Sequence, residues 1–215
     1  VVFVHDAIAG EVCDILVMKV LKKAAFGKVV AWKAVSPHRR EPDCPYYRQC
    51  GGCTFRHMDY TEELRAKGQR VQDALTRLGG SSVAVEEVLG AAEPLHYRNK
   101  GQYPVSADGR VGFYRARTHQ VTNLDACLIQ MPQADAAAGA LRLYMAKYHV
   151  PGYDEKTGTG LVRHLYVRTN AKGQSLICVV ANGEKLPRED ALVEAMRQAV
   201  PEAVGIVLNS NTRRS

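Results

Sequence analysis

D-C-P-Y-Y-R-Q-C-G-G-C-T-F-R-H (residues 43–57) places Cys44, Cys50 and Cys53 within ten residues, at the spacing C-x5-C-x2-C. A proline and a Gly-Gly pair interrupt this stretch, and it holds too few apolar side chains to form a core of its own. We therefore expect it to curl around a small group toward which three thiolates point. A fourth thiolate is available at Cys127, in the sequence D-A-C-L-I. The four cysteines predict a [4Fe–4S] cluster that connects distant parts of the chain.

Zinc is the alternative metal for this stretch. Structural zinc sites usually take their ligands from two close pairs, whereas this sequence has one close pair, Cys50 and Cys53, with His57 nearby. A zinc site made of three cysteines and His57 would leave Cys127 unused. Thiolate ligands suit both metals, so the spacing favours an iron–sulfur cluster and leaves zinc open.

The charge of the chain points to a polyanionic partner. The 215 residues carry a net charge of +7, and the sequence pI is about 9.1. Six cysteines in a sequence with no visible signal peptide favour metal ligation or reduced thiols over disulfides. No run of 18 apolar residues occurs, so we expect a cytoplasmic monomer that does not enter a membrane. The chain lacks an initiator methionine, and we expect it to be a segment of a longer protein.

Residues 1–41 read as short strands at 1–4, 15–18 and 25–32, separated by turn residues. Strands at this spacing predict part of a small antiparallel β-barrel of the OB type, incomplete in this chain, which we take as a first domain over 1–41, with an α+β domain over 42–215. Basic side chains would decorate the barrel, and a merely solubilising surface is the alternative interpretation of them. The candidates for RNA contact here are Lys22, Lys23, Arg39 and Arg40.

The remainder of the chain mixes hairpins with isolated helices, which predicts an α+β fold. Asp59 is a candidate N-cap of a helix that reaches to about residue 78, with Glu62 as its capping-box partner. Asp108-Gly109 predicts a hairpin between strands at 95–106 and 111–124. Further helices are predicted at 132–147 and 187–199, and further strands at 161–169, 175–181 and 204–208.

The predicted 95–124 hairpin is strongly basic. Between residues 96 and 119, five arginine and lysine side chains oppose only Asp108, a net charge of +4. Aromatic side chains in the same region could stack on unpaired bases or pack in the core, and alternation along a strand predicts that about half are buried. The candidates for RNA contact in this domain are Arg98, Lys100, Arg115, Arg117, Arg163 and Arg168.

Several motifs of this sequence resemble those of the bacterial 23S rRNA (uracil-5-)-methyltransferases of the RumA (RlmD) type. The cysteine run at 44–53 is similar to the cluster loop of that family. Four further matches follow in the family's order: Y-R-N-K at 97–100, V-G-F-Y-R at 111–115, D-x-C-x-I at 125–129, and V-R-H-L-x-V-R at 162–168. The opening residues, V-F-V-H-D-A-I-A-G-E, resemble part of the family's TRAM domain, an OB-like RNA-binding barrel.

The resemblance implies a function and a ligand set. It implies that Cys44, Cys50, Cys53 and Cys127 hold a [4Fe–4S] cluster, and that the partner is 23S ribosomal RNA, since tRNA-directed relatives commonly lack the cluster loop. The family methylates C5 of a uridine with S-adenosylmethionine and a cysteine nucleophile, in a Rossmann-like catalytic domain. Nothing in these 215 residues matches that domain. We therefore expect only the RNA-recognising portion here, with no catalytic or S-adenosylmethionine-binding residue.

Overall fold

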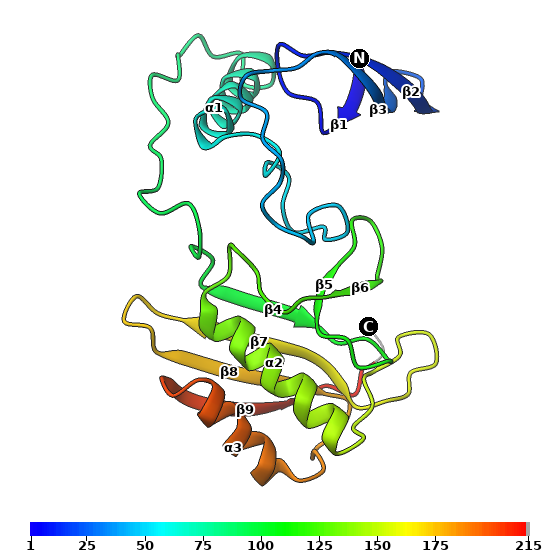
Figure 1. The fold of residues 1–215 in the computed structure, drawn as a ribbon, viewed down its shortest axis with the longest axis vertical. Helices are drawn as coiled ribbons and strands as arrows, with labels where there is room; N and C mark the ends of the chain where they lie inside the picture. Colours follow the sequence, from blue (N-terminus) through cyan, green and yellow to red (C-terminus); the bar gives the residue numbers. More distant parts are fainter. Residues whose placement is uncertain (214–215) are drawn as a thin grey trace. The chain divides into compact units, whose positions relative to one another are not determined.

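The structure is a computed structural model that describes residues 1–213, and the chain divides into two compact units (Figure 1). The first unit comprises residues 1–45 and 53–92, and the second comprises residues 46–52 and 93–215. The domain boundary expected at residue 41 stays a prediction. Within the described residues, no helix combines the length and apolar character needed to cross a membrane.

The first unit contains a three-stranded sheet rather than the expected barrel. Its strands are β1 (Val2–His5), β2 (Val12–Val20) and β3 (Ala25–Ala34), in the order β1-β3-β2. β2 runs antiparallel to β3, but β1 runs parallel to it. The prediction of an antiparallel barrel is therefore wrong for the described residues. A barrel must close by tilting and staggering its strands, and three strands are too few to do so.

A buried ion pair connects this sheet to the segment that precedes the cysteine stretch. The Glu11 side chain has no exposed surface and accepts hydrogen bonds from the Arg39 guanidinium at 2.5 and 2.6 Å. It also accepts from the indole N–H of Trp32 and from the backbone N–H groups of Ile8 and Ser36. The Arg39 guanidinium is the largest cause that lowers the pKa of Glu11 to about 2. Arg39 thus has a structural partner at a position where the sequence suggested a contact with RNA.

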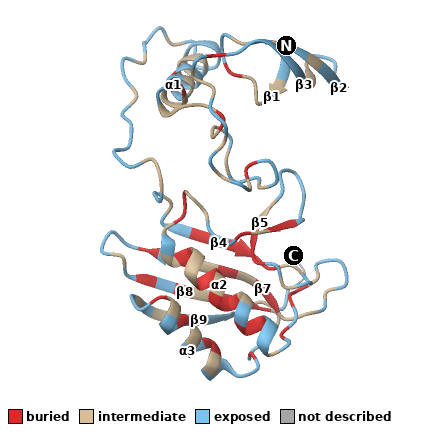
Figure 2. Cartoon of the chain, in the orientation of Figure 1, coloured by how far each residue is buried: buried red, intermediate tan, exposed pale blue. Residues whose placement is uncertain are grey.

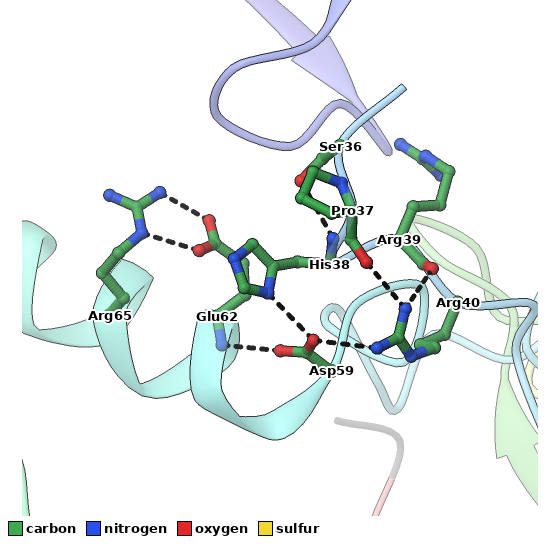
Figure 3. Close-up of polar contacts among 8 residues, drawn as sticks. All are labelled: Ser36, Pro37, His38, Arg39, Arg40, Asp59, Glu62 and Arg65. Atoms are coloured by element: carbon green, nitrogen blue, oxygen red, sulfur yellow. Dashed lines mark hydrogen bonds and ion pairs between the residues drawn. The ribbon is translucent and has the colours of Figure 1, made fainter. Parts of the chain in front are cut away.

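The helix α1 (Tyr60–Arg77) begins where the sequence predicts (Figure 3). The Asp59 carboxylate accepts the backbone N–H of Glu62 at 2.9 Å, which confirms the N-cap. The reciprocal half of the capping box does not form, because the Glu62 carboxylate pairs with Arg65 instead. The backbone N–H of Asp59 donates to the carbonyl of His38, at 2.9 Å.

The second unit is built on a four-stranded sheet with two helices on one face (Figure 1). The strand order is β4-β7-β8-β9, with β8 and β9 parallel and the other pairs antiparallel. The predicted helix at 132–147 and the central position of the strand at 175–181 are both confirmed. The elements are β4 (Lys100–Pro104), α2 (Pro132–Lys147), β7 (Val162–Thr169), β8 (Ser175–Ala181), α3 (Glu189–Ala199) and β9 (Ala203–Ser210).

The core of the second unit lies between the sheet and these helices (Figure 2). Tyr103, Leu165 and Ile177 from the sheet meet Leu141 of α2 and Met196 of α3, and all five side chains have no exposed surface. The buried face of α2 is otherwise largely alanine, so its backbone can approach the sheet closely. This packing fixes the start of α2, which holds one of the cysteine segments.

The predicted 95–124 hairpin is only partly correct. The Asp108-Gly109 turn forms, but residues 105 and 111 make the last bridge between its arms. β4 then pairs with β7, while β5 (Gly112–Tyr114) pairs with β6 (Val121–Asn123). Alternation shows which residues share a face of a strand, but it does not specify which strand is the partner.

The Glu11–Arg39 pair predicts an acid transition in the first unit. The pKa of Glu11 is lowered in the folded state, so its contribution is present above the ordinary value of 4.5 and is lost as the pH falls toward about 2. Trp32 is the only tryptophan of the chain and donates to Glu11, so its fluorescence should follow this loss. Glu11→Gln should remove the transition and lower the free energy of unfolding at pH 7 by about 3 kcal/mol.

Asp14→Asn is the matched control, because Asp14 pairs with Lys33 on the exposed surface of the same sheet. Its effect on the free energy of unfolding should stay below about 1 kcal/mol. Equal effects of the two substitutions would contradict a special role for the buried pair.

Candidate metal centre and nucleic-acid interface

The four predicted ligand cysteines are divided between the two units. Cys44 and Cys53 belong to the first unit, and Cys50 and Cys127 belong to the second. All four are partly buried, and none forms a disulfide. The cysteine stretch therefore leaves the first unit after residue 45 and returns to it at residue 53.

Residues 46–52 of this stretch are held within the second unit by their backbone and by one tyrosine. The backbone N–H of Gly51 donates to the carbonyl of Tyr114 at the end of β5, at 2.9 Å. The Tyr46 hydroxyl donates to the Asp125 carboxylate at 3.2 Å and lies 3.3 Å from the backbone N–H of Asp125, two residues before Cys127. A Cβ on Gly51 would lie 3.0 Å from that same Tyr114 carbonyl oxygen, so any larger residue there would push against the backbone of β5.

A partly buried carboxylate holds the backbone at Cys127. The Asp135 side chain, in the first turn of α2, accepts the backbone N–H of Cys127 at 2.7 Å and the hydroxyl of Tyr103 at 2.7 Å. Burial is the largest cause that raises the pKa of Asp135, and these two hydrogen bonds act against it. Burial, with the Asp135 charge, also raises the pKa of Tyr103. The position of Cys127 therefore depends on the junction between β4 and α2.

Arg142 of α2 holds the chain just before Cys127. Its guanidinium donates to the backbone carbonyls of Val111 and Leu124 and to the side-chain oxygen of Asn123. It also pairs with the exposed carboxylate of Asp125, at 3.3 Å. Val111 and Leu124 flank the β5–β6 pair, and Arg142 of α2 supplies hydrogen-bond donors to their backbone carbonyls.

Cys44 and Cys53 lie near a cation in the first unit. Arg56 makes a two-armed ion pair with Asp43, and this contact is the largest cause that raises the pKa of Arg56. The charges of Cys53 and Cys44 raise it further. Arg56 is therefore a cation placed next to two of the predicted ligand cysteines.

The donor set suits a thiolate-ligated metal, but the geometry described here does not assemble one. Within residues 1–213, no three His, Cys, Asp or Glu side chains are grouped so that they could hold a metal ion. What the structure brings together is the backbone around Cys50 with β5, and the backbone of Cys127 with α2. Four thiols at this spacing remain the chemistry that a [4Fe–4S] cluster requires.

The basic candidates differ in exposure and in their contacts within the fold. Arg163 is 7% exposed, donates to the carbonyls of Asn211 and Arg213, and stacks on Tyr153. Like Arg39, it is engaged within the fold, and we remove both from the proposed RNA contacts. Arg98 is half-buried. The exposed candidates are Lys22, Lys23, Arg40, Lys100, Arg115, Arg117 and Arg168.

The aromatic side chains divide as strand alternation predicts. Tyr103 is fully buried and stacks on Phe113, with ring centroids 4.8 Å apart. Tyr114 is half-buried and stacks on His119 at 5.2 Å, while Tyr97 is 58% exposed. Tyr97 and the outer faces of Tyr114 and His119 are therefore the rings of this region that a base could reach.

Sequence reasoning missed three residues of importance: Asp135, Arg142 and Tyr166. An acidic residue in the first turn of a proline-initiated helix is a signal that could have pointed to Asp135. Tyr166 alternates with His164 and Arg168, and the positions between them, Leu165 and Val167, are apolar, which marks one polar face of β7. Nothing local in the sequence marks Arg142, because its partners come from segments 17 to 31 residues away.

Comparison with known proteins gives homology over the whole chain. A protein of Clostridium tetani described as an uncharacterized RNA methyltransferase is 41% identical over 218 residues, which is 100% of this chain and 47% of that protein. Proteins of the same description from Bacillus cereus and Caldanaerobacter subterraneus are each 36% identical, over 100% of this chain and 48% of their own length. The chain thus spans about half the length of the curated relatives it matches. No protein-family model matches it.

A solved structure shares the fold. The crystal structure of Pyrococcus abyssi tRNA (uracil-54, C5)-methyltransferase in complex with S-adenosyl-L-homocysteine matches with a TM-score of 0.64 and 21% identity. The match covers 89% of this chain and 44% of that one. At this identity the likeness establishes the fold. The chain is therefore homologous to about half of a group of RNA methyltransferases, and it has the fold of the corresponding part of a solved uridine methyltransferase.

The Asp135 contacts predict a stability difference between two substitutions. Asp135→Leu should lower the free energy of unfolding by about 2–3 kcal/mol, because the Cys127 N–H and the Tyr103 hydroxyl lose their acceptor. Asp135→Asn should cost less than about 1 kcal/mol, since its amide can accept from Cys127 and donate to the Tyr103 oxygen. Urea unfolding followed by far-UV circular dichroism measures both.

Asp125→Asn is the control for this prediction, because the Asp125 side chain is 82% exposed in the same region. It should change the free energy of unfolding by less than about 1 kcal/mol. If Asp135→Asn were as damaging as Asp135→Leu, the negative charge rather than the hydrogen bonds would be what the site needs.

Proposed function

We propose that this chain is the RNA-recognising part of an S-adenosylmethionine-dependent uridine C5-methyltransferase that acts on 23S ribosomal RNA. The observation that carries the proposal is homology along the entire chain to proteins described as RNA methyltransferases. The fold it shares with a solved tRNA (uracil-54, C5)-methyltransferase supports uridine C5 as the target atom. The net charge of +7 supports a polyanionic substrate.

The residues present are suited to RNA binding, and we assign the binding of S-adenosylmethionine to another part of the enzyme. A methyltransferase that acts on a base must take that base out of the stack. The exposed cations and rings of this chain would hold the RNA that flanks the target uridine. Arg115 and Arg117, at the exposed tip between β5 and β6, are the leading candidates for phosphate contacts. S-adenosylmethionine would bind elsewhere in the complete enzyme, and we assign it no residue of this chain.

We further propose that Cys44, Cys50, Cys53 and Cys127 bind a [4Fe–4S] cluster with a structural role. Cys44 and Cys53 belong to the first unit, whereas Cys50 and Cys127 belong to the second. Asp135 supports this role because it fixes the backbone of Cys127 from α2. A zinc ion bound by three of these cysteines and His57 is the alternative.

Metal analysis distinguishes the two metals. After anaerobic purification we expect a brown protein with about four iron atoms and four acid-labile sulfides per chain. Cys127→Ser should lose iron and lower the melting temperature, whereas Cys178→Ser, outside the ligand set, should retain iron. One zinc and no iron would overturn the cluster. A reversible redox potential within the cellular range, with RNA affinity that changes on reduction, would replace the structural role by a redox role.

RNA binding tests the larger proposal. The 215-residue chain should bind a 23S rRNA stem-loop with an affinity that falls steeply as the salt concentration rises. Arg115→Ala combined with Arg117→Ala should weaken binding and flatten the salt dependence, because each lost phosphate contact removes about one unit from the slope. Lys172→Ala, in the exposed turn between β7 and β8, is the control. Salt-independent binding in fluorescence anisotropy would contradict the proposal.

A tRNA substrate is the second candidate, because the solved structure with the same fold is that of a tRNA methyltransferase. Competition between a tRNA T-arm and the rRNA stem-loop for the same chain separates the two candidates. The cysteine stretch supports the ribosomal substrate, so we expect the stem-loop to displace the T-arm at lower concentration.

A further inference from the structure

The sheet of the second unit has one face that no helix covers. α2 and α3 pack on the same side of β4, β7, β8 and β9 (Figure 1). The residues that alternate with the buried ones therefore point to the opposite side. Their cross-strand register places Lys100 beside Arg168, and Gln102 beside Tyr166, on neighbouring strands. We call this surface the open face of the sheet.

A row of aromatic and basic side chains runs along β7 on the open face. His164, Tyr166 and Arg168 occupy alternate positions, and the His164 and Tyr166 rings are 6.1 Å apart. The Lys100 ammonium on β4 lies 5.7 Å from the centre of the Tyr166 ring. Lys100 and Arg168 are exposed. Both cations therefore border a ring that is itself partly exposed.

The same face continues as apolar surface on the next two strands. Leu176 on β8 is the register partner of Arg168 and is 47% exposed. Cys178 is the partner of both Tyr166 and Val207, and Val207 on β9 is 46% exposed. Large apolar side chains at this exposure on two adjacent strands favour a ligand with apolar surface.

Among the described residues, the outward-facing positions of the four strands carry no acidic side chain, although the Glu155 carboxylate lies close enough to His164 to act on its pKa. These positions on the four strands carry Lys, Gln, Pro, His, Tyr, Arg, Leu, Cys, Val, Gly and Asn side chains. The carboxylate that acts on His164 is Glu155, which pairs with His119 at 2.6 Å. Burial is the largest cause that lowers the pKa of His164, so its ring is neutral near pH 7 and can pack against a base. Charge complementarity thus favours a polyanion with flat apolar groups.

We propose that the open face binds single-stranded RNA, with a base stacked on Tyr166 and backbone phosphates at Lys100 and Arg168. The spacing of the side chains supports a single strand. Alternate positions on β7 are about 6.6 Å apart, whereas bases in a duplex follow one another at about 3.4 Å. Rings at this spacing can contact bases only where the bases are separated from one another. Sequence-tolerant stacking of this kind is how many proteins hold single-stranded RNA.

This inference rests on the proposed function and adds to it a specific surface and a binding mode. The β5–β6 tip carries Arg115 and Arg117 next to the stacked rings of Tyr114 and His119, and it is separate from the four strands of the open face. This tip would contact phosphates of folded RNA, whereas the open face would bind the unpaired segment beside the target uridine. The two surfaces therefore predict different responses to single-stranded and duplex RNA.

Fluorescence anisotropy with a labelled oligouridine of about ten nucleotides tests the proposal on the 215-residue chain. Tyr166→Ala should weaken binding roughly tenfold to a hundredfold, since loss of one stacked base has an effect of this size. Tyr166→Phe should bind like the unchanged chain, because it keeps the ring. Arg168→Ala should lower the salt slope by about 0.7 for one phosphate contact on a single strand.

Arg197→Ala is the matched control, because Arg197 is exposed on α3, on the covered side of the sheet. It should leave oligouridine binding unchanged, and a duplex of equal length should bind all variants alike. Tyr166→Leu, which fills the strand position without a ring, replaces Tyr166→Ala if thermal melting shows that the alanine variant is unfolded.

Three outcomes would overturn the inference. If Tyr166→Ala, Tyr166→Leu and Arg168→Ala bind oligouridine like the unchanged chain, the open face does not contact RNA, although the proposed function stands. If the same variants weaken duplex binding as much as oligouridine binding, the open face contacts phosphates and not bases. If the unchanged chain binds neither oligouridine nor the stem-loop, the proposed function fails together with the inference.

Discussion

The hydrogen bonds of the Asp135 carboxylate are the interaction on which the second unit most depends. One oxygen accepts from Tyr103 in the core of the sheet, and the other accepts from the backbone of Cys127. A carboxylate is costly to bury, and its raised pKa expresses that cost. The two hydrogen bonds offset that cost, because each carboxylate oxygen accepts from one donor. Packing of the sheet and the position of a cysteine are thereby coupled through one side chain.

Local signals in the sequence were enough for most helices and strands, and for one helix cap. Asp59 caps α1, Pro132 begins α2, and the strands β7 and β8 lie where alternation and turn residues predict. Strand partners were not predictable in this way. β1 pairs with β3 in parallel, and β4 pairs with β7 rather than with the other arm of its hairpin. Long-range packing selects among pairings that are locally equivalent.

Prediction of the candidate site had a similar limit. The cysteines and most of the exposed cations follow from residue type and spacing. Arg39 and Arg163 show what residue type cannot reveal, since a guanidinium satisfies buried carboxylate or carbonyl groups as readily as phosphates. Tyr166 shows the converse: its environment, with an open side and two neighbouring cations, arises only when β4 and β7 pair.

The path of the cysteine stretch has a consequence for how such a protein can be divided or recombined. The chain passes between the units after residues 45, 52 and 92. Residues 46–52 contact Tyr114 and Asp125 of the second unit. Along the chain, however, they lie between the two segments that form the first unit. A gene segment that ends after residue 92 would therefore include residues 46–52, which form part of the second unit.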